Sequence, residues 1–154
     1  MIHLIRHARP PVARQRIAPS PIAPASIFCS PLERAVDTAN LLFPGHKIRI
    51  LPELAEIGMG EWEGKTWEEI EARWPGLAKA KLDDWTAAPA PGGEAWSDFE
   101  ARVRTAWRIL IAAPSPVAVV AHAGVNSVLR QFATGQDPTT FSQDYCEVIS
   151  LEFE

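Results

Sequence analysis

The sequence reads Val117-Ala118-Val119-Val120-Ala121-His122-Ala123-Gly124 at the point that decides the fold. The first five residues form an apolar run with the length of a strand. An apolar stripe at helical spacing follows the glycine, at Val125, Val128 and Leu129. We therefore predict a buried strand over 117–121 that leads directly into a helix. A strand followed at once by a helix is a building unit of α/β folds.

The same design opens the chain. Ile2–Ile5 is a second short apolar run, and Arg6-His7 follows it as His122 follows 117–121. Further strands are expected at Ile27–Cys29, Lys47–Leu51 and Val148–Phe153. Because these short strands alternate with helical segments, we predict a three-layer α/β/α sandwich with a mostly parallel central sheet.

Three further helices are marked by capping boxes, in which a Ser or Thr precedes a Glu by three residues. The boxes are Ser30–Glu33, Thr66–Glu69 and Ser97–Glu100. In the first box, Ser30 is the expected N-cap and Pro31 the first helical residue. The three helices are expected to end at Pro44-Gly45, at Trp74-Pro75-Gly76 and before Pro114, and a weaker helical piece is expected over Leu77–Trp85.

A proline-rich segment separates the first two strands. Pro10, Pro11, Pro19, Pro21 and Pro24 fall within residues 9–26. Prolines at this density exclude a regular helix or a central strand, so the segment is expected to be a loop. The length of 154 residues, with 47% hydrophobic and 22% charged residues, fits a single globular domain over 1–154.

Charge and cysteine usage narrow the class of protein. The net charge of -4 argues against a broad cationic face for nucleic acid, although a few focused arginines can still bind a small anion. Cys29 and Cys146 have no CxxC spacing, which favours a reduced cytoplasmic protein over a disulfide scaffold. The first apolar run is too short for a signal sequence or a membrane span. We therefore expect neither nucleic acid nor a membrane as a partner.

Two histidines follow matching strands, and this is the first sign of chemistry. Function in open α/β sheets gathers at the carboxyl ends of the strands. If 2–5 and 117–121 are neighbours, His7 and His122 lie side by side. Neutral imidazole can attack phosphorus near pH 7, so either histidine is a candidate nucleophile, and the other, if protonated, can stabilise phosphoryl oxygens. A single histidine after a strand more often has a structural role. Two histidines after matching strands, one of them beside an arginine, favour a catalytic role instead.

An anion pocket and a proton carrier complete the pattern. Arg6 and Arg34 can hold a phosphoryl group with planar forks that keep their charge. The backbone N–H groups at the start of the helix, at Ala123 and Gly124, can add partial positive charge. Glu56, in a glycine-rich loop, can give a proton to a leaving alkoxide and then take one from water. A metal site made of His7, His122 and Glu56 is disfavoured, because two arginines would repel the cation.

These segments together resemble the histidine phosphatase superfamily, also called the phosphoglycerate mutase-like family. Ile5-Arg6-His7-Ala8 is similar to its Arg-His-Gly signature, and Leu54-Ala55-Glu56 to the start of its proton-donor loop. The other similar segments, in the family's order, are Ser30-Pro31-Leu32-Glu33-Arg34-Ala35 with Thr38-Ala39, Gly60-Glu61-Trp62-Glu63-Gly64, Pro91-Gly92-Gly93-Glu94 and Val120-Ala121-His122-Ala123-Gly124-Val125.

The resemblance implies a metal-independent phosphatase of small-molecule phosphate esters that uses no cofactor. His7 would carry the phosphoryl group as phosphohistidine, and Glu56 would serve as acid and then base. Arg6, Arg34, His122 and Ala123 would form the phosphate pocket. The Gly-Glu-Trp-Glu-Gly and Pro-Gly-Gly-Glu segments are most similar to the branch that contains alpha-ribazole phosphatases and broad-specificity phosphatases. Alpha-ribazole phosphate is therefore the specific candidate substrate.

The chain also departs from the family pattern. Ala8 stands where the family usually has Gly, Ala13 stands where it usually has Asn, and a short loop replaces a helix after His7. Two alternatives stay open: a phospho-ligand-binding module with vestigial catalysis, and a phosphoglycerate mutase-type phosphotransferase. The missing helix leaves a sheet face that a second subunit in a homodimer or the remaining helices could cover. Glu94 belongs either to the site or to the brace of the helix after Ser97.

Overall fold

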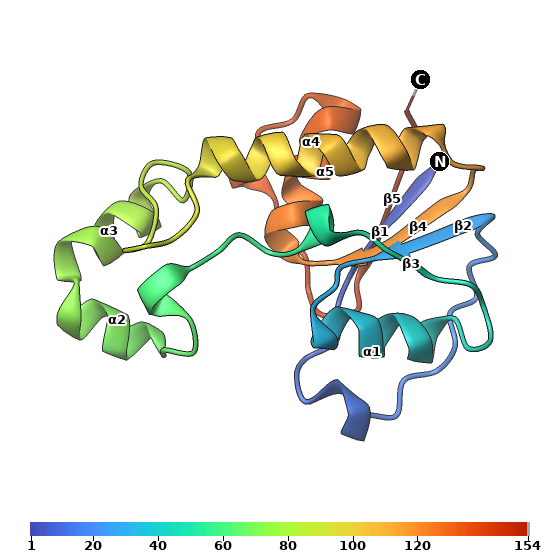
Figure 1. Ribbon diagram of the computed structural model, residues 1–154, viewed down its shortest axis with the longest axis horizontal. Coiled ribbons are helices and arrows are strands. Elements are labelled where there is room, and N and C mark those ends of the chain that lie inside the picture. Colours follow the sequence, from blue (N-terminus) through green and yellow to red (C-terminus); the bar gives the residue numbers. More distant parts are fainter. Residues whose placement is uncertain (154) are drawn as a thin grey trace. The chain divides into compact units, whose positions relative to one another are not determined.

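A mostly parallel sheet forms the centre of the computed structural model, which describes residues 1–153 (Figure 1). Within these residues the strand order is β3-β2-β4-β1-β5. The strands are β1 Ile2–Arg6, β2 Ser26–Cys29, β3 Arg49–Ile50, β4 Val117–Ala121 and β5 Val148–Leu151. The first four run parallel to their neighbours, and β5 pairs antiparallel with β1. The predicted α/β fold with a mostly parallel sheet is therefore confirmed.

The helices alternate with the strands along the chain. They are α1 Glu33–Leu42, α2 Trp67–Arg73, α3 Pro75–Asp83, α4 Trp96–Ala112 and α5 Ala123–Thr134. Short 3-10 turns occur at Val12–Arg14, Pro52–Leu54, Gly60–Trp62 and Pro138–Thr140. Among the described residues no helix is both long and apolar enough to cross a membrane.

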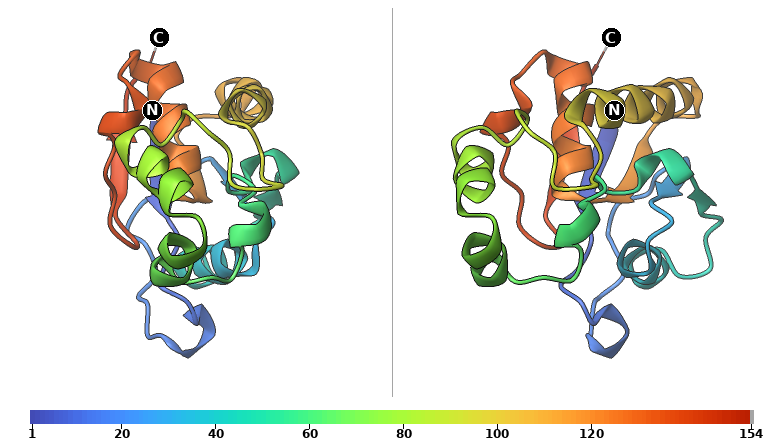
Figure 2. Two further views of the ribbon diagram at one scale, coloured as in Figure 1. Left: turned by 90° about the vertical axis from the view of Figure 1, so that its left-hand side faces the viewer. Right: turned by 60° about the vertical axis from the view of Figure 1, so that its left-hand side comes forward.

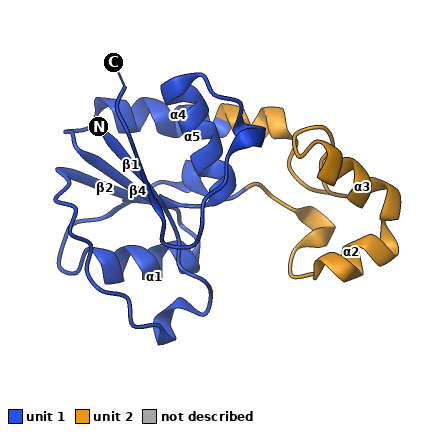
Figure 3. Ribbon diagram, turned by 180° about the vertical axis from the view of Figure 1, so that it is seen from behind, with its two compact units in different colours: residues 1–56, 102–154 blue, residues 57–101 orange. Residues whose placement is uncertain are grey.

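The chain divides into two compact units (Figure 3). One unit comprises Met1–Glu56 and Arg102–Glu154 and contains the sheet, α1 and α5. The other comprises Ile57–Ala101 and contains α2 and α3, with α4 crossing the boundary. The larger unit contains all the residues for which catalysis or phosphate binding is predicted. That residues 1–154 form a single domain stays a prediction.

Helices cover both faces of the sheet in the larger unit. Figures 1 and 2 show α1 on one face, and α5 with the last part of α4 on the other. On the α1 face, Leu42 and Phe43 pack with side chains of β1, β2 and β4. The apolar runs of β1 and β4 are buried along their whole length, as expected of central parallel strands covered on both sides.

The proline-rich segment lies on the α1 side of the sheet and is attached at several points. Ile17 packs against the apolar cluster under α1. The Ser20 amide donates to the Leu42 carbonyl at 2.8 Å, and the Ala25 amide donates to the Pro116 carbonyl at 2.8 Å. A short extended segment thus occupies part of the surface that the missing helix would cover.

Two of the three predicted N-caps are wrong, because the helices begin at other residues. Thr66 caps α2 as expected, since its hydroxyl accepts from the Glu69 amide at 3.2 Å. Ser30, however, is not the N-cap of α1, because the helix begins at Glu33 after Leu32. Ser97 is not a cap either, because it lies inside α4. Both boxes match the pattern, but the helices begin elsewhere in the local sequence.

Two elements differ in extent from those predicted from the sequence. Residues 47–51 form only the two-residue strand β3, and Pro75 begins α3 rather than simply ending α2. In the second unit Trp62 is buried and packs with Ile70, Ala78 and Ala90. Trp67 and Trp74 pack against the same cluster, so these tryptophans contribute to the core of this unit.

Candidate active site

His7 and His122 lie side by side, with ring centroids 5.0 Å apart. Each histidine follows a strand of the same parallel pair, in which Arg6 of β1 stands opposite Ala121 of β4. The His7 amide also donates to the Ala121 carbonyl at 3.0 Å, which extends the ladder to the histidines. The register of the sheet therefore brings together the two residues that the strand pattern singled out.

The surroundings of His7 determine which ring nitrogen carries the proton. His7 is buried, and its Nδ1 lies 2.8 Å from the carbonyl oxygen of Ala8. A carbonyl oxygen can only accept, so Nδ1 carries the proton and the lone pair of a neutral ring is on Nε2. Burial lowers the pKa of His7 below 6.5, the charges of Arg34 and Arg6 lower it further, and the bond to Ala8 opposes them. His7 is therefore mostly neutral at pH 7, with the lone pair of the ring on Nε2.

His122 is more deeply buried and is held by Ser30. Its Nε2 lies 2.7 Å from the Ser30 hydroxyl, which also accepts from the Leu32 amide at 3.2 Å. Burial, and then the charges of Arg34 and the nearby His7 and Arg6, lower the pKa of His122 to about 3. His122 is thus neutral at pH 7. Its Nδ1 is a buried polar atom that has no hydrogen-bond partner among residues 1–153.

Arg6 has a similar unsatisfied atom. Its Nη1 donates to the carbonyl of Gln143 at 2.7 Å, whereas its buried Nε has no hydrogen-bond partner within the described chain. Buried polar groups without a partner are uncommon in folded proteins and often mark a binding site. Two such atoms, on Arg6 and His122, belong to residues that flank His7.

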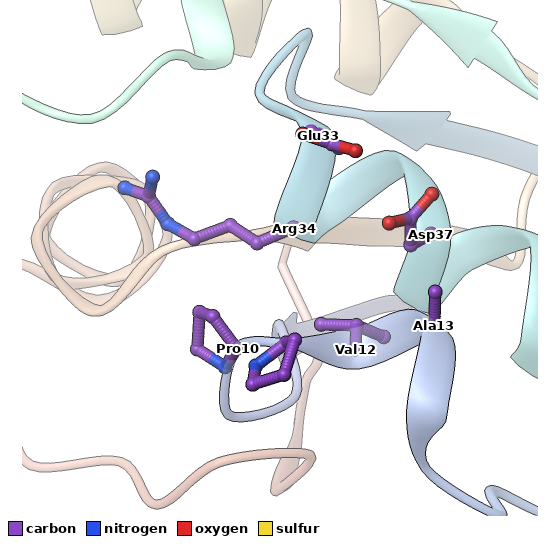
Figure 4. A pocket seen from close by; sticks show the side chains of 7 residues that line it. Pro10, Val12, Ala13, Glu33, Arg34 and Asp37 are labelled. Atoms are coloured by element: carbon purple, nitrogen blue, oxygen red, sulfur yellow. The ribbon is translucent and has the colours of Figure 1, made fainter.

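Arg34 approaches the same histidine from α1. Its Nε donates to His7 Nε2 at 3.4 Å. Its side chain also lines a cavity of about 410 Å³, together with Pro10, Pro11, Val12, Ala13, Glu33 and Asp37. In Figure 4 the guanidinium of Arg34 extends away from Glu33 and Asp37. Arg34 therefore contacts both Nε2 of His7 and a cavity of mixed apolar and acidic walls.

Glu56 contacts the start of α5. Its Oε2 accepts from the Gly124 amide at 3.1 Å, and a Cβ at Gly124 would lie 3.0 Å from the Glu56 carboxyl carbon. Only glycine leaves room for this carboxylate. The Gly124 amide, which was expected to face a phosphate, thus bonds to Glu56. Ala123 is the first residue of α5, and its role in phosphate binding stays a prediction.

Several supporting residues escaped the sequence analysis. Arg102 donates to the carbonyls of Glu53 and Ala55 at 2.9 and 2.7 Å and to that of Glu56 at 3.4 Å, which fixes the turn that carries the carboxylate. The Thr38 hydroxyl accepts from the Ala8 amide at 2.9 Å. These contacts join segments far apart in the sequence, so a local pattern could not reveal them.

Glu94 makes two hydrogen bonds with the backbone of Gly58. Glu94 Oε1 accepts from the Gly58 amide at 3.2 Å, and the Glu94 amide donates to the Gly58 carbonyl at 2.8 Å. Glu94 therefore joins two loops of the second unit.

Among residues 1–153 no three His, Cys, Asp or Glu side chains gather as a metal site, so a site of His7, His122 and Glu56 gains no support.

A family model matches nearly the whole chain. The model is described as histidine phosphatase superfamily (branch 1), and its match covers residues 12–154. The chain belongs to the histidine phosphatase superfamily. The match begins after Arg6-His7-Ala8, so the position of His7 in the site rests on the sheet register rather than on this alignment.

Two curated proteins illustrate what the chain is similar to. The glucosyl-3-phosphoglycerate phosphatase of Mycobacterium tuberculosis is 36% identical over 118 residues, which cover 69% of this chain and 52% of that protein. The adenosylcobalamin/alpha-ribazole phosphatase of Salmonella typhimurium is 34% identical over 107 residues, which cover 67% and 53%. The chain thus spans about half the length of the curated relatives it matches.

A solved structure of the superfamily shares the fold. A mycobacterial glucosyl-3-phosphoglycerate phosphatase in complex with VO3 aligns with a TM-score of 0.76 at 26% identity. The alignment covers 96% of this chain and 90% of that one. The phosphoglycerate mutase-like architecture expected from the resemblance is therefore confirmed.

Proposed function

We propose that the chain is a phosphomonoesterase that hydrolyses a small-molecule phosphate ester through a phosphohistidine on His7. The observation that carries this proposal is the hydrogen bond from His7 Nδ1 to the Ala8 carbonyl, because it places the lone pair of the neutral ring on Nε2, the nitrogen that Arg34 Nε contacts at 3.4 Å. The nearby atoms His122 Nδ1 and Arg6 Nε, which are buried and unsatisfied, supply donors for phosphoryl oxygens.

The phosphate pocket forms from four groups around that nitrogen. Arg6 and Arg34 provide fixed positive charge on guanidinium forks, which suit tetrahedral oxyanions. In the tautomer that this proposal assigns to His122, the Ser30 hydroxyl, 2.7 Å away, donates to Nε2, and the proton on Nδ1 donates a hydrogen bond to a phosphoryl oxygen. The amide of Ala123 adds the positive end of the α5 dipole. In this proposal His122 donates a hydrogen bond as a neutral imidazole, whereas the sequence prediction was a protonated histidine in this role.

Two displacements complete the reaction. In the first, His7 Nε2 bonds to phosphorus, the ester P–O bond breaks, and the Glu56 carboxyl gives its proton to the leaving alkoxide. In the second, the Glu56 carboxylate takes a proton from water, the water oxygen bonds to phosphorus, and the P–N bond breaks. Inorganic phosphate leaves and Glu56 is protonated again. The contact with Gly124 supports this role, since it fixes the carboxyl beside the helix that follows His122.

The alcohol part of the substrate has room beside Arg34. The cavity of about 410 Å³ suits a small organic group, and its prolines offer apolar contacts. Glu33 and Asp37 in its wall disfavour an alcohol with a second anionic group. Among the substrates named for the relatives, glucosyl-3-phosphoglycerate carries a carboxylate and alpha-ribazole phosphate does not. Alpha-ribazole phosphate is therefore the ester that we propose testing first.

Hydrolysis of 4-nitrophenyl phosphate in the presence of a metal chelator tests the proposal. We expect turnover without added metal, inhibition by vanadate, and loss of activity in His7→Ala. His46→Ala is the matched control, because His46 is an exposed histidine that bonds only locally, to the Pro44 carbonyl. Inactivity of the wild-type protein across a broad panel of phosphate esters, with and without divalent ions, would overturn the proposal.

A phospho-ligand-binding module with vestigial catalysis is the second candidate. It is favoured by Ala8 and Ala13, which stand where the family pattern usually has Gly and Asn. This candidate predicts that inorganic phosphate raises the melting temperature while turnover is absent. A phosphotransferase of the mutase type predicts instead that the phosphoryl group passes to a second alcohol rather than to water, which product analysis distinguishes.

Location and assembly remain predictions. Cys29 and Cys146 are both free thiols, which supports a reducing compartment and hence the cytoplasm. The homodimer is motivated by the short loop in place of a helix, and light scattering on the purified protein tests it. A monomer at micromolar concentration would remove that prediction.

A further inference from the structure

Tyr145 contacts two residues of the proposed site at once. The Arg6 guanidinium carbon lies 4.0 Å from the centre of the Tyr145 ring. The His7 ring lies 5.6 Å from the same ring, centre to centre, at an angle of 58°. Tyr145 is the one tyrosine of the sequence, and it is 45% exposed. An aromatic ring therefore stands between the solvent and the two residues proposed to carry and bind the phosphoryl group.

The loop that carries Tyr145 is fixed to β1. The Cys146 amide donates to the Arg6 carbonyl at 3.0 Å, and Cys146 has a positive φ of 60°. Residues other than glycine hold this conformation only where their surroundings impose it, often at functional sites. The buried Gln143 donates to the carbonyls of Leu4 and Glu147, at 2.9 Å each. The position of the ring is thus set by backbone contacts on both sides of it.

The contact with Arg6 bears directly on phosphate binding. Gln143 accepts from Nη1 of Arg6 at 2.7 Å, and the Tyr145 ring covers a face of the guanidinium. These two contacts fix the plane of the fork while the Nε donor is left without a partner among residues 1–153. An arginine held in one orientation loses less freedom when it binds an oxyanion.

We infer that Tyr145 is a positioning residue for phosphate. Its ring holds Arg6 in the orientation that binds the phosphoryl group and forms the wall of the site beside His7. The inference rests on the proposed function, since it assumes that Arg6 binds the phosphoryl group of the substrate. The ring, rather than the hydroxyl, positions Arg6, because the ring makes the contacts with both Arg6 and His7.

Fluorine NMR tests the inference without relying on turnover. Replacement of tyrosine by 3-fluorotyrosine gives one resonance, because the sequence has one tyrosine. We expect this resonance to shift saturably on titration with inorganic phosphate, at concentrations that also raise the melting temperature. In Arg6→Gln the shift should be lost at those concentrations. A resonance that stays in place while phosphate stabilises the wild-type protein overturns the inference but not the proposed function.

Kinetics separate positioning from a merely structural role. Tyr145→Phe keeps the ring and should keep the wild-type inhibition constant for phosphate within about twofold. Tyr145→Leu should raise that constant on the order of tenfold, with little change in melting temperature because the side chain is half exposed. Trp85→Leu, at a 40% exposed aromatic in the other unit, is the control. Equal effects of Phe and Leu, or none from Leu, contradict a role for the ring.

Discussion

Arg6 of β1 stands opposite Ala121 of β4 in the parallel ladder, and the next residue of each strand is a histidine. This pairing is why the rings of His7 and His122 lie 5.0 Å apart. A shift of the register by two residues would move one ring away by about 6.6 Å, beyond the reach of one phosphoryl group. The candidate site therefore depends on the central strand pair, the most buried part of the sheet, and its chemistry can be tested residue by residue.

The pKa of His7 is expected to lie below 6.5 in the free protein. Burial is the main cause, and the charge of Arg34 adds to it. Arg34→Gln removes that charge, so the pKa of His7 should rise in the variant. The sequence has four histidines, so NMR titration of the ring C–H signals can follow His7, assigned through His7→Gln. A His7 pKa above 6.5, or one that falls in Arg34→Gln, would contradict this electrostatic account.

Acid should destabilise the protein in part through His122. The pKa of His122 is about 3 in the folded chain and near 6.5 when unfolded, so between these values the unfolded state binds more protons. Stability from this residue is present above pH 6.5 and is lost as the pH falls toward 3. Urea unfolding at pH 7 and pH 5 should show a smaller pH effect in His122→Gln than in the wild type. An equal pH effect in both proteins would refute the prediction.

Gly124→Ala should impair proton transfer by Glu56. The added methyl group meets the Glu56 carboxylate and must displace it. General acid catalysis contributes about 10²–10⁴-fold to rates, and it matters most for poor leaving groups. We therefore expect at least about a tenfold loss of kcat/KM, which reports the first displacement, for an alkyl phosphate and a smaller loss of kcat/KM for 4-nitrophenyl phosphate. Gly76→Ala is the control, because a Cβ there meets nothing within 4 Å. Equal losses for both substrates would argue against a proton-carrying Glu56.

Charge in the cavity wall should set substrate preference. Glu33→Gln and Asp37→Asn each remove a negative charge from a cavity that Arg34 also lines. The ratio of kcat/KM for 3-phosphoglycerate to that for glycerol 3-phosphate should rise in the double variant. We expect a rise of only about several-fold, because water weakens the repulsion between exposed charges. The effect should shrink at high ionic strength. An unchanged ratio would place the alcohol group outside this cavity.

The positions of the histidines could be predicted from the sequence because they depend on local pattern and one topological rule. Apolar runs define β1 and β4, and parallel strands present their carboxyl ends at the same edge. The same reasoning placed Arg34 near the edge, since it follows β2 by a few residues. In each case the residue lies next to the strand that positions it.

The supporting contacts could not be predicted, because they join distant segments. Arg102 donates to the carbonyls of Glu53, Ala55 and Glu56, and the Tyr145 loop contacts Arg6 across most of the chain. Ser30 matches a cap pattern, yet its hydroxyl lies against His122, 92 residues away, and a local motif cannot decide between these partners. The Ser30 hydroxyl thus makes a local contact with the Leu32 amide and a distant one with His122.

Rapid-quench trapping of the phosphorylated enzyme tests the central claim most directly. The wild-type protein is mixed with a phosphate ester, quenched in alkali within milliseconds, digested and analysed by mass spectrometry. We expect an acid-labile phosphoryl group on Nε2 of His7, formed at a rate at least equal to kcat and absent in His7→Ala. Phosphate release with no phosphorylated histidine, or with the phosphoryl group on His122, would contradict it.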